Sequence, residues 1–197
     1  MQPNAATLRL AVIPRTDLIT NALLVLAGVL LVAGAAQIRI PLADTPVPIT
    51  GQTFAVLLVG AAYGAPLGAT TLIAYWLIGL AGAPIYAEGK SGWDTFVGAT
   101  GGYIVGFILA AALTGYLAEK RWDRRFSSSL SAMLIGNVVI YVPGLLWLAH
   151  YLDTGVNDTL EAGLYPFVLG DTIKLFLAGA LLPAAWLAVK RFRGDQS

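Results

Sequence analysis

Six stretches of this chain are almost entirely apolar, and this pattern limits the folds that the chain can adopt. Hydrophobic residues make up 57% of the 197 residues and charged residues only 12%, and mean hydropathy is +0.74, far outside the range of soluble domains. We therefore predict an all-α integral membrane protein, a single domain over residues 1–197 with six transmembrane helices. The predicted spans are Leu18–Ala36, Gln52–Tyr63, Pro66–Leu80, Gly101–Ala118, Leu130–Tyr151 and Leu164–Val189. The second and third are short, and runs of this length can also be re-entrant.

The basic residues between these stretches are unevenly distributed. With six spans and a cytoplasmic N-terminus, only Arg39 and Lys90 lie outside. The inside segments then hold Arg9, Arg15, Lys120, Arg121, Arg124, Arg125, Lys190, Arg191 and Arg193. This is the asymmetry of the positive-inside rule. We expect a multi-pass protein of the cell membrane with both termini in the cytoplasm.

Several kinds of chemistry are disfavoured by the composition. The chain has no cysteine, which excludes disulfides and thiolate chemistry, and its single histidine, His150, argues against a histidine-rich metal centre. Net charge is +1 and the basic residues form no stripe, so nucleic acid is not an expected partner. The apolar composition makes the lipid bilayer the expected partner. A Walker-type nucleotide motif is also missing. We expect no enzyme activity, and neither a metal nor a cofactor.

Asp171 and Lys174 lie inside the last apolar stretch. A helix that enters the membrane near Tyr165 would place them about 9 and 14 Å deep, within a core about 30 Å thick. At spacing i, i+3 they share a helix face. An ionisable residue at such a depth is a functional-site hypothesis by default. The alternatives are an ion pair that only fixes helix register, an intramembrane general acid or base, and a proton-coupled carrier in which Asp171 titrates.

Two external segments are unusual for simple connections. Arg39–Gln52 contains three prolines, which fix an extended path that can line a cavity mouth or act only as a stiff connector. Gly82–Gly101 is too long for a turn and rich in aromatic residues, so we expect a lid over a site. Its aromatic residues Tyr86, Trp93 and Phe96 are candidate walls for a ligand, whereas Glu88, Lys90 and Asp94 are interpreted as solvated loop charges.

Two further features allow more than one interpretation. The run Gly98–Tyr103 begins the fourth span, where free backbone N–H groups favour a bound carboxylate, but glycine packing explains the same residues equally well. Asn137 and Tyr141 are four residues apart in the fifth span and face the same way. They either add polar groups to a central cavity or, in the case of Asn137, bridge two helices.

Taken in order, four pieces of the chain resemble the BioY family, the biotin-binding S components of energy-coupling-factor (ECF) transporters. The pieces are Thr45-Pro46-Val47-Pro48-Ile49-Thr50 with Gln52, Gly82-Ala83-Pro84-Ile85-Tyr86, Gly98-Ala99-Thr100-Gly101-Gly102-Tyr103 and Gly170-Asp171-Thr172-Ile173-Lys174. The chain departs from the family pattern at Ala99, where proline is frequent. It also lacks a clean pair of small residues at spacing four in its first span.

The resemblance implies a six-helix protein that binds biotin in an outward pocket capped by external loops and serves in biotin uptake. Its partners would be an ECF coupling protein and ATPase subunits, or further copies of the chain. An ionised Asp171 can accept hydrogen bonds from the ureido N–H groups of biotin. The candidate substrate-binding residues are Asp171, Lys174, Tyr86, Thr100, Gly101, Gly102, Tyr103, Gln52, Thr50 and Asn137. An S component for another small vitamin and a solitary proton-coupled carrier remain alternatives.

Overall fold

The computed structural model describes residues 6–194, with side chains up to residue 192, and this part of the chain is mostly helical. Its helices are α1 (Leu8–Val12), α2 (Leu18–Gln37), α3 (Gln52–Tyr63), α4 (Ala65–Leu80), α5 (Gly92–Phe96), α6 (Gly101–Glu119), α7 (Phe126–Leu152), α8 (Val156–Gly163) and α9 (Val168–Gly194). Three short 3₁₀ turns are η1 (Ala87–Gly89), η2 (Trp122–Arg124) and η3 (Tyr165–Phe167). Strands β1 (Arg39–Ile40) and β2 (Ile49–Thr50) pair antiparallel, with Arg39 opposite Thr50. The predicted all-α class is confirmed.

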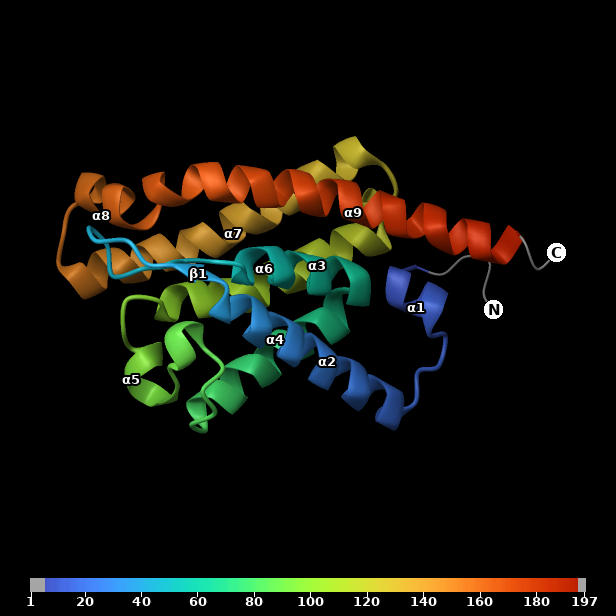
Figure 1. The fold of residues 1–197 in the computed structure, drawn as a ribbon, viewed down its shortest axis with the longest axis horizontal. Coiled ribbons are helices and arrows are strands. Elements are labelled where there is room, and N and C mark those ends of the chain that lie inside the picture. Colours follow the sequence, from blue (N-terminus) through green and yellow to red (C-terminus); the bar gives the residue numbers. More distant parts are fainter. Residues whose placement is uncertain (1–5, 195–197) are drawn as a thin grey trace.

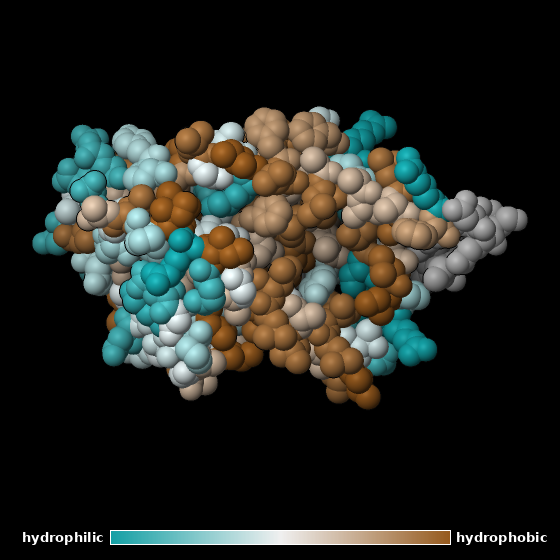
Figure 2. Space-filling model, viewed as in Figure 1, coloured by the Kyte–Doolittle hydropathy of each residue, from teal (hydrophilic) through white to brown (hydrophobic). Residues whose placement is uncertain are grey.

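Membrane-spanning length distinguishes two groups of helices. Among the described residues, four segments are long and apolar enough to cross a membrane: α2, α6, α7 and the stretch Val156–Phe192 that contains α9. Helices α3 and α4 have 12 and 16 residues, or about 18 and 24 Å, which is shorter than a bilayer core. Figure 2 shows hydrophobic residues over the middle of the molecule and hydrophilic ones at its two ends. The membrane class is therefore supported, and the count of six spans stays a prediction.

Helix α6 lies at the centre of the bundle and packs against α3, α4 and α7, while α9 packs against α7 and α3. Small residues permit the close approach. A Cβ atom at Gly60 of α3 would meet the backbone of Ala111, and one at Gly115 would meet the turn between α3 and α4. That turn contains Gly64, whose φ of +88° is rarely adopted by residues with side chains. Gly60 of α3 and Gly68 of α4 thus serve packing, because a Cβ atom at Gly68 would in turn meet the backbone of Gly60.

The two ends of the molecule differ in what they carry. Figure 1 places the β1–β2 hairpin, α5 and α8 at one end and both termini with α1 at the other. The hairpin end contains the segments for which a cavity mouth and a lid were predicted. Helix α8 lies between the fifth and sixth predicted spans and was not predicted. The last helix begins at Val168, four residues later than the predicted span, because the η3 turn at Tyr165–Phe167 precedes it.

Candidate functional site

A cavity lies at the hairpin end, between the first turns of α3, α6 and α9, the middle of α7 and the segments 46–50 and 86–100. The empty space within it is about 780 Å³, open solvent at its mouth included. Its lining residues are Pro46, Val47, Pro48, Thr50, Gln52, Thr53, Tyr86, Ala87, Glu88, Lys90, Thr95, Thr100, Tyr103, Ile104, Phe107, Ile140, Tyr141, Phe167, Asp171 and Lys174. Apolar walls with a few converging polar groups are typical of small-molecule sites.

Asp171 is the most heavily hydrogen-bonded side chain of this cavity. The residue is 4% exposed and lies in the first turn of α9. One carboxylate oxygen accepts from Tyr141 Oη at 2.6 Å and from Asn137 Nδ2 at 3.2 Å. The other accepts from Lys174 Nζ at 2.9 Å and from Thr53 Oγ1 at 3.4 Å. Because an ionised carboxylate has about four acceptor positions, the protein itself occupies them, and the bond from Thr53 is the longest.

Lys174 completes an ion pair with Asp171, one helical turn further along α9. Its ammonium group also donates to Thr53 Oγ1 at 3.3 Å. An ammonium group carries three donors, and these are its two hydrogen bonds to residues in the described part of the chain. The side chain is 19% exposed, compared with 5% for Asp171. A third donor of Lys174 is therefore available to a molecule in the cavity.

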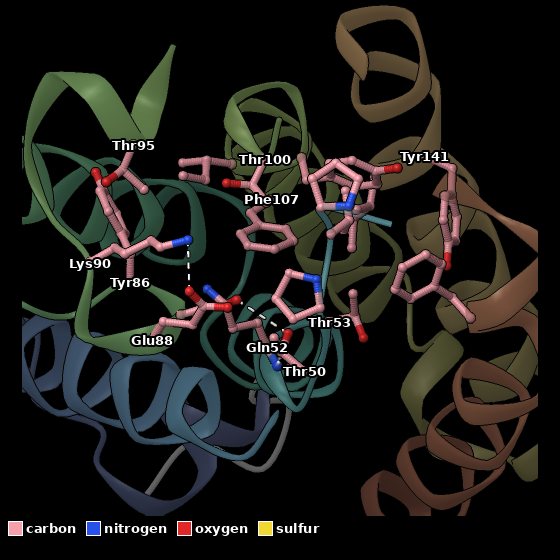
Figure 3. A pocket seen from close by; sticks show the side chains of 18 of the residues that line it. Thr50, Gln52, Thr53, Tyr86, Glu88, Lys90, Thr95, Thr100, Phe107 and Tyr141 are labelled. Atoms are coloured by element: carbon pink, nitrogen blue, oxygen red, sulfur yellow. Dashed lines mark hydrogen bonds and ion pairs between the residues drawn. The ribbon is translucent and has the colours of Figure 1, made fainter. Parts of the chain in front are cut away.

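A hydrogen-bonded chain of side chains forms the wall near α3. Gln52 Nε2 donates to Tyr75 Oη at 2.8 Å, and Thr50 Oγ1 donates to Gln52 Oε1 at 3.2 Å. Tyr75 in turn donates to the carbonyl oxygen of Ile85 at 3.0 Å. These bonds hold the hairpin, α3 and the segment after α4 in a fixed relation. In Figure 3, Gln52 and Thr50 lie below Phe107, with Tyr141 on the far side.

The segment between α4 and α6 folds back over the cavity. Tyr86, Glu88 and Lys90 line the opening from this segment (Figure 3). Glu88 pairs with Lys90 at 2.7 Å and with Arg39 of β1 at 3.2 Å. Glu88 also adopts a φ of +67°, an uncommon conformation for a residue with a side chain. The segment therefore contributes to the wall of the cavity and is tied by charges to the hairpin.

The basic residues around Glu88 also affect the pKa of its carboxyl group. The hydrogen bond from the Lys90 ammonium, together with the charges of Lys90 and Arg39, lowers the pKa of Glu88 below its ordinary value despite partial burial. Glu88 therefore stays ionised at neutral pH and holds both basic residues. Glu88 and Lys90 are exposed, as expected of solvated loop charges, and both also line the mouth of the cavity.

Seven of the ten candidate residues lie on the cavity wall: Asp171, Lys174, Tyr86, Thr100, Tyr103, Gln52 and Thr50. Three do not. Asn137 lies behind Asp171 and donates to it. Gly101 and Gly102 are packing positions, because a Cβ atom at Gly101 would meet the carbonyl oxygen of Phe96 and one at Gly102 would meet Pro143 and Trp147 of α7.

Several lining residues were not among the candidates. Tyr141 was noted only for its shared face with Asn137, and that spacing was the available signal. Thr53 follows Gln52 directly in the sequence but carried no signal of its own. Phe107 and Phe167 could not be told from lipid-facing or core residues. Trp93 and Phe96, expected as ligand walls, instead contact each other at 5.6 Å between ring centroids and lie outside the lining.

The fold and the cavity define a multi-pass membrane protein with an internal site for a small, partly polar molecule. The model of the BioY family matches residues 5–191. A biotin transporter BioY of Thermotoga maritima is 38% identical over 80% of this chain and 92% of its own length. One of Rhizobium etli is 33% identical over 84% of this chain and 90% of its own length. The chain belongs to the BioY family and is a multi-pass protein of the cell membrane.

A solved structure shares this fold. The crystal structure of the S-component for biotin from an ECF-type ABC transporter superposes with a TM-score of 0.74 at 22% sequence identity. The similarity covers 86% of this chain and 94% of that one.

Proposed function

We propose that this chain binds biotin in the cavity below the segment 86–100 and serves in biotin uptake across the cell membrane. The observation that carries the proposal is the ion pair Asp171–Lys174 on the wall of a cavity that combines apolar and polar side chains. Membership of the BioY family supports this choice of ligand, because the relatives from Thermotoga maritima and Rhizobium etli are named biotin transporters.

The chemistry of biotin fits the lining. Its ureido ring offers two N–H donors and one acceptor, and its thioether ring and chain are apolar. A ureido N–H can replace Thr53, the most distant donor to Asp171, while the free donor of Lys174 reaches the ureido oxygen or the terminal carboxylate. Ile104, Phe107 and Phe167 supply apolar surface for the ring and chain.

Equilibrium binding of labelled biotin to the purified, detergent-solubilised chain tests the ligand directly. We expect saturable binding that unlabelled biotin displaces and other vitamins do not. Displacement by a different vitamin would replace biotin with that compound as the ligand. An absence of saturable binding would contradict the proposal.

The segment 86–100 should close over the bound ligand. Closure normally orders such a segment, so biotin should slow hydrogen exchange across Tyr86–Phe96. Helix α8, which lies outside the cavity lining, serves as the internal control and should change less. Unchanged exchange across Tyr86–Phe96 on saturation with biotin would remove the lid from the proposal.

Energy for uptake has to come from outside this chain if ATP drives the process, because a Walker-type motif is missing from its sequence. Liposomes that contain this chain alone separate the possibilities. Binding without accumulation indicates that coupling and ATPase subunits are required. Accumulation that is abolished when the proton gradient is collapsed indicates a solitary proton-coupled carrier.

A further inference from the structure

A second cavity lies at the opposite end of the molecule, between α1, α2 and α4. Its empty space is about 1550 Å³, open solvent included, which is larger than the biotin cavity by the same measure. The walls are largely apolar and include Leu18, Val25 and Val29 of α2 and Leu67 and Ile78 of α4. Leu18 is 83% exposed, so this cavity is an open groove on the membrane-facing side of α2.

A buried cation lies in this groove. Arg9 is 8% exposed, and within the described part of the chain its guanidinium donates a hydrogen bond to Asn21 Oδ1. Its buried Nε atom has no acceptor among residues 6–192. A buried charge is costly unless it is paired and hydrogen-bonded. Arg9 thus has a charge and a donor that the described chain does not satisfy.

Other polar groups of the groove lie near Arg9. They include Thr7 and Thr16 beside α1 and Asn21 in the first turn of α2. Glu119 is the acid of the lining, and its Oε1 accepts from the backbone N–H of Ala65 at 2.9 Å. That bond engages the carboxylate at the N-terminus of α4, and no ion pair joins Glu119 to Arg9 among the described residues.

We propose that this groove binds an anionic phospholipid of the inner leaflet, with the phosphate on Arg9 and an acyl chain between α2 and α4. Charge complementarity identifies the occupant, because Arg9 has no anionic partner among the described residues. The guanidinium matches phosphate oxygens, and a headgroup with a net negative charge neutralises it, whereas a zwitterionic headgroup brings its own cation. The apolar walls match an acyl chain. Basic pockets between helices on the cytoplasmic side are suited to anionic headgroups. The groove lies at the end with both termini, which the basic residues assign to the cytoplasm (Figure 1).

The test measures the lipid that stays on the full-length chain. The protein is reconstituted in vesicles of equal phosphatidylglycerol and phosphatidylcholine, extracted gently, and its bound lipid is determined by native mass spectrometry. The parent should retain phosphatidylglycerol in preference to phosphatidylcholine. Arg9→Gln should reduce that preference about fivefold, whereas Arg9→Lys should keep most of it. Equal retention of the two lipids by the parent would overturn the proposal.

Matched variants separate the groove from general effects of charge and folding. Arg15 is exposed and outside the groove, so Arg15→Gln should keep the preference. Ala22 lines the groove and Ala27 of the same helix does not, so Ala22→Trp should expel the lipid and Ala27→Trp should not. If Arg9→Gln does not fold, the comparison of Ala22→Trp with Ala27→Trp decides whether the lipid occupies the groove. Loss of the preference in Ala27→Trp alone, or its persistence in Ala22→Trp, would contradict the proposal.

Discussion

Two buried acid–base pairs at opposite ends of this molecule have similar components and different surroundings. Asp171 pairs with Lys174 and accepts from the Tyr141 hydroxyl. Asp123 pairs with Arg124 at 3.2 Å and accepts from the indole N–H of Trp186. Each aspartate is almost fully buried, at 4% and 1% exposure.

The surroundings of the two pairs set their roles apart. Lys174 lines the cavity at the hairpin end and has a donor left for a ligand. Arg124 instead lies over the Trp186 ring, 3.3 Å from its centroid, and ties the η2 turn to α9. Burial raises the pKa of Asp123 above its ordinary value despite Trp186 and Arg124. The comparison teaches that a buried ion pair becomes a binding group only where a cavity leaves part of it unsatisfied.

The largest expected effect comes from breaking the cavity pair. Lys174→Met leaves the Asp171 carboxylate buried without its cation, so the free energy of unfolding should fall by about 3 kcal/mol and biotin binding should be lost. Thermal unfolding in detergent and labelled-biotin binding measure the two effects.

The double variant Asp171→Asn with Lys174→Met removes both charges and serves as the control. It should recover most of the stability but not the binding. Normal biotin affinity in the double variant would reduce the pair to a structural role and make the two ends of the molecule equivalent.

A smaller effect is expected at the end that contains Asp123. Asp123→Ala leaves the Trp186 N–H without its acceptor and Arg124 without its carboxylate, but Arg124 is 25% exposed and can be hydrated. The free energy of unfolding should fall by about 2 kcal/mol, and the biotin affinity of the folded protein should not change. A large loss of affinity at matched stability would contradict the separation of the two pairs.

The smallest effect concerns pH and the cover of the cavity. The pKa of Glu88 is lowered in the folded protein, so its pairs with Lys90 and Arg39 are fully formed above the ordinary carboxyl value of 4.5. Their contribution disappears as pH falls through the lowered value, and for such exposed pairs it is at most about 1 kcal/mol.

The ratio of biotin dissociation rates in Glu88→Gln and the parent chain isolates this contribution. The parent should dissociate more slowly near neutral pH, and the two rates should converge as the medium becomes acidic. A ratio that stays constant across this range would show that the ion pairs do not hold the cover closed.

Prediction from the sequence succeeded where a residue type carries its own physical signal. Asp171 and Lys174 were identified because charges within an apolar stretch are costly, and the structure brings them to the cavity. The helix boundaries of α3 and α4 follow the apolar runs closely. Signals of this kind depend on neighbours in the sequence and are therefore visible in it.

Features that depend on long-range folding were missed. The ion pair of Glu88 with Arg39 of β1, which brings the segment after α4 beside the hairpin, joins residues far apart in the sequence and has no local signal. Thr53 contacts Asp171 across a separation of 118 residues, which no local pattern reveals. Gly101 and Gly102 carry a pattern that suits both anion binding and helix packing, and the structure shows the packing contacts.

The most direct test measures biotin affinity and thermal unfolding for Asp171→Asn and Asp123→Asn side by side. Both changes remove a buried negative charge at similar burial. Asp171→Asn should weaken biotin binding roughly ten- to hundredfold, because charge-assisted hydrogen bonds contribute about 1 to 3 kcal/mol, and Asp123→Asn should leave the affinity unchanged. Equal biotin affinity in Asp171→Asn and the parent chain would remove Asp171 from the binding site and contradict the distinction between the two pairs.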